Sequence, residues 1–471
     1  MINIPKVIEL VVDNDLCIGC GLCTYKCPSD ALKMDWNEDG FLVPFQIDNC
    51  DNCELESNCI SVCPFNPFPN ENVKTENEIS DIFLSETSFR DKQIGKYNSI
   101  YTGYSKDYRL TSSSGGIGTY VLDQLLSKGI VDHVFSVKEG GENSFYQYSI
   151  SSNRQELLKT SKTRYFPVTL SNVFSELDKI EGRVAIVGVA CFIKAIRLAQ
   201  ISDKSLKKKI PFLVGIICGG VKSNFFTEYL ADSSGVKVSA INKPEYRIKN
   251  TKSSAGDYSF GCIDEISKKE SRIKMSTVGD MWGTGLFKAN ACDFCDDVTT
   301  ELADISVGDA WIQPHVLDGK GTNVIVSRSK ISELILNAGH RNGQLFLEEL
   351  SKEKMINSQK GSFNHRQLTL PYRINIAKKN NIPVPPKRVS NSKISLNLKI
   401  VQYYRMKARA KSFEIWKKSR KSKDFNRDMK NLLFILRKVT KVNHYMRTLF
   451  SKNLGKAAKR KVLKYKDRFN F

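Results

Sequence analysis

The chain contains 471 residues, which is enough for two to four domains with sizeable hydrophobic cores. Its 41% hydrophobic and 26% charged content is typical of a globular protein, and its longest apolar runs are too short to cross a bilayer. The formal net charge is +22, but it is unevenly distributed. Residues 387–471 contain 27 Lys or Arg and four Asp or Glu, whereas the residues before 387 contain 45 and 46. The excess positive charge therefore belongs to a C-terminal tail.

The N-terminal residues show no basic segment followed by an apolar stretch, so we expect no secretory signal peptide. Thirteen cysteines without such a signal are typical of metal ligands in a reducing compartment. We therefore expect a cytoplasmic protein, with peripheral attachment to the inner face of the membrane as a second location to test.

Two cysteine motifs dominate the N-terminal part of the chain. The first has the pattern C-x2-C-x2-C-x3-C-P, with Cys17, Cys20, Cys23 and Cys27, and the second contains Cys50, Cys53, Cys59 and Cys63, again followed by proline. In two-cluster ferredoxins the fourth cysteine of each motif ligates the cluster of the other motif. We therefore expect one [4Fe-4S] cluster on Cys17, Cys20, Cys23 and Cys63, and another on Cys50, Cys53, Cys59 and Cys27. Structural zinc and disulfides are the alternatives, but zinc sites favour two CxxC pairs or added histidines.

Residues 66–98 are polar and predict a linker with some helix, after which short apolar strands alternate with helices. We expect strands near 131–137, 184–189, 212–217, 245–249, 257–261 and 303–307. Helices are expected near 117–128, 191–200 and 224–231. This alternation predicts an α/β domain with a largely parallel, buried sheet.

Cys191 and Cys218 each follow a predicted buried strand, and Cys292 and Cys295 form a CxxC shortly before another. Ligands gather beyond the carboxyl ends of strands in open α/β sheets, so these four thiols could share a third cluster. Buried structural cysteine is the alternative for them, and it is our expectation for Cys262. Residues 112–118 form a Ser/Gly-rich loop before a helix, which indicates either an anion site or an ordinary helix cap.

The motifs from about residue 10 to about 330 resemble, in their order, the family of coenzyme F420 hydrogenase/dehydrogenase beta subunits. After the ferredoxin motifs they are SSSGGIG (112–118), KGIVD (128–132), GVACF (188–192), ICGGV (217–221), CDFC (292–295) and ADISVGDAW (303–311). The sequence departs from the family at Ala190, where relatives often carry proline, and at Gly219, where they often carry histidine.

The resemblance implies FAD and an additional [4Fe-4S] cluster beside the two ferredoxin clusters. By position, Cys191, Cys218, Cys292 and Cys295 become the ligands of that additional cluster. Contacts to FAD are implied for Ser113, Ser114, Gly115 and Gly116, and a place near its ring for Gly308 and Asp309.

These observations predict four parts: a two-cluster ferredoxin domain of α+β fold (1–70), a linker (71–98), an α/β flavin and iron–sulfur domain (99–385) and a helical basic tail (386–471). The predicted function is an iron–sulfur flavoprotein oxidoreductase that passes electrons to or from a small molecule. That molecule is coenzyme F420 or another reducible substrate, including one in polysaccharide biosynthesis. The alternative is an electron-transfer module that serves a partner protein and has no substrate site of its own.

The tail has two interpretations, since apolar residues in 429–450 recur at three- and four-residue steps among Lys and Arg. An amphipathic helix of this kind packs on the protein body or an acidic partner, or it lies on an anionic membrane surface. Nucleic acid is not an expected partner, because no recognised nucleic-acid-binding motif accompanies the charge.

Overall fold

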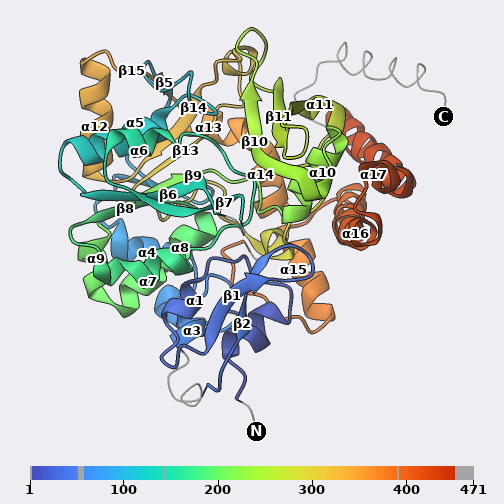
Figure 1. Cartoon of the computed structure of the whole chain (residues 1–471), viewed down its shortest axis with the longest axis horizontal. Coiled ribbons are helices and arrows are strands. Elements are labelled where there is room, and N and C mark those ends of the chain that lie inside the picture. The colour runs from blue at the N-terminus through green and yellow to red at the C-terminus, as the bar shows by residue number, and fades with distance from the viewer. Residues whose placement is uncertain (1–2, 51–57, 142–143, 390–391, 451–471) are drawn as a thin grey trace.

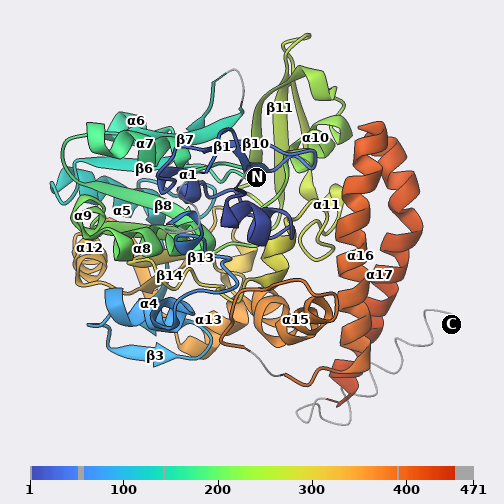
Figure 2. The ribbon, with the colours of Figure 1, turned by 90° about the horizontal axis from the view of Figure 1, so that it is seen from below.

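The computed structural model describes residues 3–50, 58–141, 144–389 and 392–450. Three parts are visible in Figure 1: a small N-terminal unit with the first two strands, a large central sheet, and a pair of long C-terminal helices along one edge. Figure 2 shows the two long helices running side by side at that edge.

The N-terminal unit contains one antiparallel strand pair, β1 (Leu32–Trp36) and β2 (Leu42–Gln46), and the short helices that carry the cysteines. The cysteine-bearing helices are α1 (Leu22–Tyr25), with Cys23, and α3 (Asn58–Ser61), with Cys59, and the π-helix η1 (Ile8–Val12) precedes the first motif. Gly21 has a φ of +81°, and a Cβ there would lie 2.1 Å from Oγ1 of Thr169 in the large domain. Only glycine fits this close approach, so the cysteine loop is held directly against the large domain. The unit is the ferredoxin-like domain expected from the cysteine motifs.

Residues 71–98 contain regular structure that packs on the body. They form η2 (Glu71–Val73), α4 (Glu76–Phe83), and the hairpin of β3 (Phe89–Asp91) and β4 (Gly95–Tyr97). Thr75 and Glu78 close a capping box at the start of α4. Glu76 is buried and pairs with Lys194 at 3.0 Å, which ties this segment to the central domain.

The large sheet has eight strands in the order β15-β5-β14-β13-β9-β8-β6-β7. Their bounds are β5 Ser99–Ser105, β6 His133–Glu139, β7 Tyr146–Ser151, β8 Val184–Val189, β9 Phe212–Ile216, β13 Ile305–Asp309, β14 Asn323–Ser327 and β15 Leu345–Glu349. The four central strands β13, β9, β8 and β6 are parallel. The flanking strands pair antiparallel, so the sheet is mixed, and the expected parallel arrangement holds for its centre.

Both faces of the central strands are covered. In β8, Val184 and Ile186 pack in the core toward the N-terminal unit, while Ala185 packs in the core on the opposite face. The helices over these two faces include α5 (Ile117–Ser127), α8 (Ala190–Ser202) and α12 (Lys330–Arg341). Burial on both faces explains why β8 and β9 appear in the sequence as continuous apolar runs.

The remaining elements surround this core. The helices are α6 Arg154–Leu158, α7 Ser171–Glu176, η3 Leu177–Lys179, α9 Lys204–Lys209, α10 Asn224–Ser233, η4 Val238–Ala240, α11 Met275–Val278, η5 Asn290–Phe294, η6 His315–Leu317, α13 Lys352–Ser358, α14 Lys360–Phe363, η7 Asn364–Leu368 and α15 Leu370–Lys379. A second sheet is antiparallel and consists of β10 (Ile241–Lys249), β11 (Tyr258–Asp264) and β12 (Glu270–Lys274).

The C-terminal helices α16 (Leu396–Ser419) and α17 (Ser422–Phe450) form a hairpin that packs on the body. Trp416 and Phe425 are fully buried among Tyr229 and Phe287, and the Trp416 indole donates to Glu228 at 2.8 Å. This part of the tail therefore belongs to the folded body, as one of the two interpretations expected. Within the described residues, the helices are too short or too polar to cross a membrane.

Candidate functional site

The first predicted set of cysteines comes together from both motifs. Burial raises the pKa of the Cys23 thiol, and the neighbouring thiols of Cys20, Cys17, Cys63 and Cys59 raise it further. Cys63, from the second motif, therefore lies beside the first motif, as a two-cluster ferredoxin requires. The Gly19 amide donates to the Cys17 sulfur at 3.4 Å, a contact that stabilises a charged thiolate.

The structure describes only part of the second predicted set of cysteines, Cys50, Cys53, Cys59 and Cys27. The Cys59 pKa is raised by burial and by nearby Cys27, so these two predicted ligands of the second cluster are neighbours. Cys50 is fully buried and is disulfide-bonded in this structure, so ligation of iron by Cys50 requires its reduction to the thiolate. Cys53 lies outside the described residues.

The third set converges from three separate parts of the chain. Cys191 lies in the first turn of α8, Cys218 follows β9, and Cys292 and Cys295 lie in and directly after η5. Burial raises the Cys191 pKa strongly, and the thiols of Cys292, Cys295 and Cys218 add to the shift. Cys262, by contrast, is buried in the second sheet beside Ser234, away from these four.

Hydrogen-bond donors point at the sulfurs of this third set. The Gly220 amide donates to Cys218 and the Val221 amide to Cys292, each at 3.2 Å. The guanidinium of Arg366 donates to the Cys295 sulfur at 3.4 Å and to the Asp297 carbonyl at 2.6 Å. Amide and guanidinium donors around cysteine sulfurs are the groups that tune the potential of an iron–sulfur cluster.

Among the described residues, no three His, Cys, Asp or Glu side chains are close enough to hold a single metal ion. A [4Fe-4S] cube spreads its thiolates over four corners and needs a wider spacing than a mononuclear ion. Four thiols with amide donors, and no histidine among them, fit the cube better than a zinc site.

The first and third sets lie next to each other. The Cys20 thiol contributes to the raised pKa of Cys191. Burial raises the pKa of Tyr148, and the thiols of Cys191 and Cys20 raise it further. Helix α1, which follows Cys20, packs against α8, which carries Cys191. The sequence motifs contained no signal of this adjacency, because the two cysteines belong to motifs that lie far apart in the chain.

A cavity of about 640 Å³ lies beyond the carboxyl ends of the central strands. Cys218 from the third set lines it, together with residues from β8, β9 and β13. Of the predicted flavin contacts, five line this cavity: Ser113, Ser114, Gly116, Gly308 and Asp309. The cavity volume falls within the usual range for cofactor and small-molecule sites.

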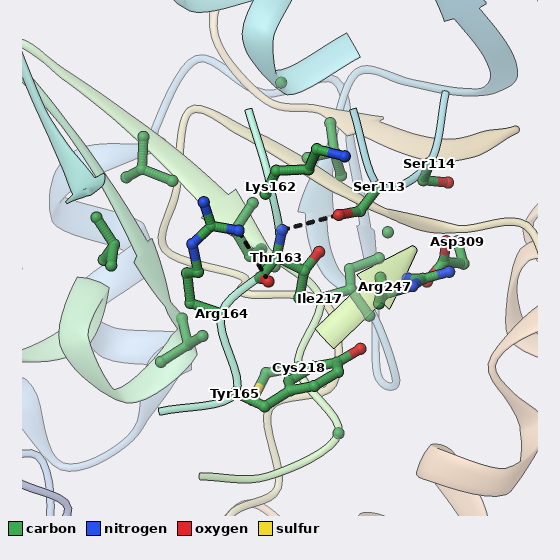
Figure 3. A pocket seen from close by; sticks show the side chains of 18 of the residues that line it. Ser113, Ser114, Lys162, Thr163, Arg164, Tyr165, Ile217, Cys218, Arg247 and Asp309 are labelled. Carbon is green, nitrogen blue, oxygen red and sulfur yellow. Dashed lines mark hydrogen bonds and ion pairs between the residues drawn. The ribbon is translucent and has the colours of Figure 1, made fainter. Parts of the chain in front are cut away.

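The Ser/Gly-rich loop before α5 supports the cavity wall, but its groups are already partly engaged. Ser113 accepts a hydrogen bond from the Thr163 amide at 2.8 Å (Figure 3), and the Ile117 amide donates to Asn323 at 3.1 Å. Gly115 lies behind the loop, where a Cβ would come within 2.7 Å of the Gly103 carbonyl oxygen. We therefore assign Gly115 to close packing of the loop rather than to the cavity wall.

Sequence reasoning missed the cationic residues of the cavity. Lys162, Arg164, Lys222 and Arg247 line it, and Asp309 is the single carboxylate among the described lining residues. Figure 3 shows Lys162 and Arg164 on the loop next to Ser113, and Arg247 facing Asp309. Arg247 and Asp309 form an ion pair at 2.6 Å. Lys162 pairs with Glu245 at 2.8 Å, and burial lowers the pKa of Lys222 to about 7. Among the described lining residues, Arg164 is therefore the cation that most favours an anionic ligand.

Aromatic residues form another part of the wall. Tyr165 and Trp282 lie edge to face with ring centroids 4.8 Å apart, and Lys222 lies under the Trp282 ring at 4.7 Å. Trp282 also fills the space beside Gly219, where a Cβ would contact its ring at 3.1 Å. Residues 160–166 and 282 fall in stretches of the sequence without a recognised motif, so only the folded chain brings them to the cavity.

The fold and the thiol sets together define an iron–sulfur protein with a ferredoxin domain joined to an α/β domain. A family model described as "4Fe-4S dicluster domain" matches residues 16–66. The models for the coenzyme F420 hydrogenase/dehydrogenase beta subunit, N-terminal and C-terminal parts, match residues 100–175 and 181–353. The chain belongs to the family of coenzyme F420 hydrogenase/dehydrogenase beta subunits, as its motifs indicated.

Named relatives are distant in sequence. The coenzyme F420-dependent sulfite reductase of Methanocaldococcus jannaschii is 25% identical over 74% of this chain, and the chain spans about half (49%) of that relative. The beta subunit of the coenzyme F420 hydrogenase of Methanosarcina barkeri is 24% identical over 57% of this chain and 92% of its own length. The F420-reducing [NiFe] hydrogenase complex of Methanosarcina barkeri has a chain with 19% identity and a TM-score of 0.48, covering 64% of this chain and 99% of its own.

Proposed function

We propose that this protein is an iron–sulfur flavoprotein oxidoreductase that connects ferredoxin-type [4Fe-4S] clusters to FAD in the 640 Å³ cavity. The observation that supports this most is the position of Cys218. It belongs to the third thiol set and also lines the cavity that contains the Ser113–Ser114 wall. A cluster on that set would therefore lie at the edge of the flavin site.

The thiol sets form an ordered series in this proposal. The set of Cys27, Cys50, Cys53 and Cys59 holds the outer cluster, and that of Cys17, Cys20, Cys23 and Cys63 the next. Because Cys20 neighbours Cys191, the latter cluster is the one that faces the third set. Electrons would pass from the outer cluster through these two to the cavity, or in the reverse direction.

The residues of the cavity fit FAD. The Arg164 guanidinium and the Lys162 ammonium, which also pairs with Glu245, lie next to the serine wall and suit the pyrophosphate, and the Tyr165 and Trp282 rings suit a flat heterocycle. A bound flavin supplies the exchange between one-electron clusters and two-electron organic substrates. The chain's own role is to bind and orient the cofactor and to exclude water around Cys218.

The proposed acceptor rests on the family rather than on the cavity. Relatives are named for coenzyme F420, so a deazaflavin is the first acceptor to test, and another small reducible substrate is the second. Three relatives are named as subunits, which makes a partner subunit or electron-donor protein a reasonable addition. If the protein only serves such a partner, it remains an electron-transfer module without a substrate of its own.

Anaerobic reconstitution of the full chain with iron, sulfide and FAD tests the proposal. Wild-type protein should hold about 12 iron atoms, four for each of three cubes, together with releasable FAD. Cys218→Ser should lower the iron content by about four atoms. Cys262→Ser, a change at a buried cysteine outside the sets, should leave it unchanged.

Two results would contradict parts of this proposal. Equal iron contents in Cys191→Ser, Cys218→Ser and wild type would contradict the proposal of a third cluster. Three clusters without bound FAD would favour the electron-transfer module. Reduction of the clusters by dithionite, followed by oxidation with added coenzyme F420, then tests the acceptor.

A further inference from the structure

The outer face of α17 is rich in exposed basic residues. The inner face of this helix is buried through Phe425, Met429, Leu436 and Asn443. The exposed residues on the opposite side recur at three- and four-residue steps: Lys423, Arg427, Lys430, Phe434, Arg437, Lys438 and Lys441. We refer to these seven residues as the basic face.

Acidic residues are absent from most of this helix. Asp424 and Asp428 pair with Arg427 near its start, and the sequence then contains no Asp or Glu until Asp467. The neighbouring helix α16 differs, because Glu414 pairs there with Lys411 and Lys418. The later part of the basic face therefore lies on a stretch of helix that has cations but no carboxylates of its own.

Apolar side chains lie within or beside the basic face and are exposed to solvent. Phe434 is 54% exposed, Ile435 39% and Val442 41%. Phe434 lies between Lys430 and Lys438 along the same side of the helix, and the Lys438 ammonium is 4.8 Å from its ring centroid. Exposed apolar groups of this size next to Lys and Arg suit the boundary between lipid head groups and acyl chains.

The hairpin forms one edge of the molecule (Figure 2), so a flat surface could approach α17 without meeting the rest of the body. The chain continues from α17 with 21 further residues, 451–471, which contain eight Lys or Arg and one Asp. More positive charge therefore follows directly from the end of the basic face.

From the basic face and its exposed apolar residues, we propose that α17 binds the surface of a membrane containing anionic phospholipids. The cations contact the lipid phosphates, and Phe434 inserts at the level of the head groups. A nucleic acid would satisfy the charge but would leave Phe434, Ile435 and Val442 in water, whereas the head-group boundary of a membrane accommodates both the cations and these apolar groups. The protein would be held on the membrane surface, since the described helices do not span it.

Sedimentation of the full-length protein with lipid vesicles tests this inference independently of redox activity. Wild-type protein should bind vesicles of two parts phosphatidylcholine to one part phosphatidylglycerol at low salt and should bind vesicles of pure phosphatidylcholine weakly. The triple variant Lys430→Gln/Arg437→Gln/Lys441→Gln should bind the anionic vesicles about 100-fold more weakly, because each nearby cation contributes about a five-fold factor.

A matched control removes three exposed lysines elsewhere, through Lys204→Gln, Lys208→Gln and Lys354→Gln. Lys204 and Lys208 lie on α9, at the opposite end of the molecule (Figure 1), so this variant should bind nearly as the wild type does. Phe434→Ala should weaken binding several-fold and by the same factor at low and high salt.

Four results would overturn the inference. The inference would be wrong if wild-type protein did not bind anionic vesicles at low salt. It would also be wrong if the triple variant and the wild type bound them equally. Unchanged binding by the triple variant, with loss after deletion of 451–471, would transfer the site from α17 to the terminal segment. Tighter binding to a DNA duplex than to the vesicles would assign the basic face to nucleic acid instead.

Discussion

Arg388 offers a sharp test of how the basic C-terminal region is joined to the body. Its guanidinium makes a bidentate contact with Glu301, with both N···O distances at 2.6 Å. The side chains are 7% and 2% exposed. Breaking a buried pair by removing one partner leaves the other charge uncompensated, which costs about 3–5 kcal/mol. At pH 9, where Glu301 is ionised, we therefore expect Arg388→Ala to lower the free energy of unfolding by at least about 3 kcal/mol.

The loss should depend on pH in a defined direction. Burial raises the pKa of Glu301 to about 8, although Arg388 opposes that shift. Since this pKa lies above the usual 4.5, the folded protein retains a proton that the unfolded chain releases between about pH 4.5 and pH 8. The contribution of Glu301 to the free energy of unfolding is therefore fully present below pH 4.5 and is lost as the pH rises through 8. Removing Arg388 raises the pKa further, so the destabilisation should be smaller at pH 6 than at pH 9.

Urea unfolding of the anaerobic full-length protein, followed by circular dichroism at both pH values, measures this effect. Arg388→Ala/Glu301→Gln removes the uncompensated charge and should recover more than half of the lost stability. Arg427→Ala, at an exposed ion pair on α17, is the control and should change stability by less than about 1 kcal/mol. A loss below about 1 kcal/mol for Arg388→Ala at pH 9, or no recovery in the double variant at that pH, would refute the reasoning.

Other changes address the site and the hairpin. Arg366→Ala removes a cation and a hydrogen bond from the Cys295 sulfur, so the potential of the third cluster should fall in an EPR-monitored redox titration; an unchanged potential would separate Arg366 from that cluster. Lys162→Ala and Arg164→Ala should weaken FAD retention without changing iron content, as measured by flavin fluorescence after gel filtration, with Lys208→Ala as the control. Trp416→Ala should destabilise the protein by about 3–5 kcal/mol in a thermal unfolding assay, because it empties a fully buried site; a change under about 1 kcal/mol would mean that the hairpin is loosely attached.

The parts of the fold that depend on local patterns were predictable from the sequence. The apolar runs of β8 and β9 were recognised, and the structure has β8 at 184–189, as expected. The strand that was expected at 303–307 lies at 305–309 in the structure. The shift of two residues arises because Ala303 and Asp304 still belong to the preceding turn. The polar segment 66–98 was expected to be a linker with some helix, and it contains α4 but also the β3–β4 strand pair, and its buried contacts come from distant residues such as Lys194.

The candidate site was predictable where cysteines and glycines form spaced motifs. Cys218 and Ser113 could be named from the sequence, but nothing local showed that they line one cavity. The cations Lys162, Arg164 and Arg247 lie in stretches of the sequence without a recognised motif, and only the folding of the chain brings them to the cavity. The flanking strands β5 and β14 were also missed, because antiparallel pairing between segments so distant in the chain leaves no periodic signal.

Arg409 of α16 has a consequence for how the protein is made. It pairs with Asp15, beside the first cysteine motif, at 3.6 Å and with Asp293, inside the CDFC motif, at 3.5 Å. A ribosome synthesises the two cysteine regions long before this arginine leaves the exit tunnel. Until then, the link that Arg409 makes between the first and third thiol sets is missing. An incomplete chain therefore lacks one of the contacts that fix the spacing between these two sets.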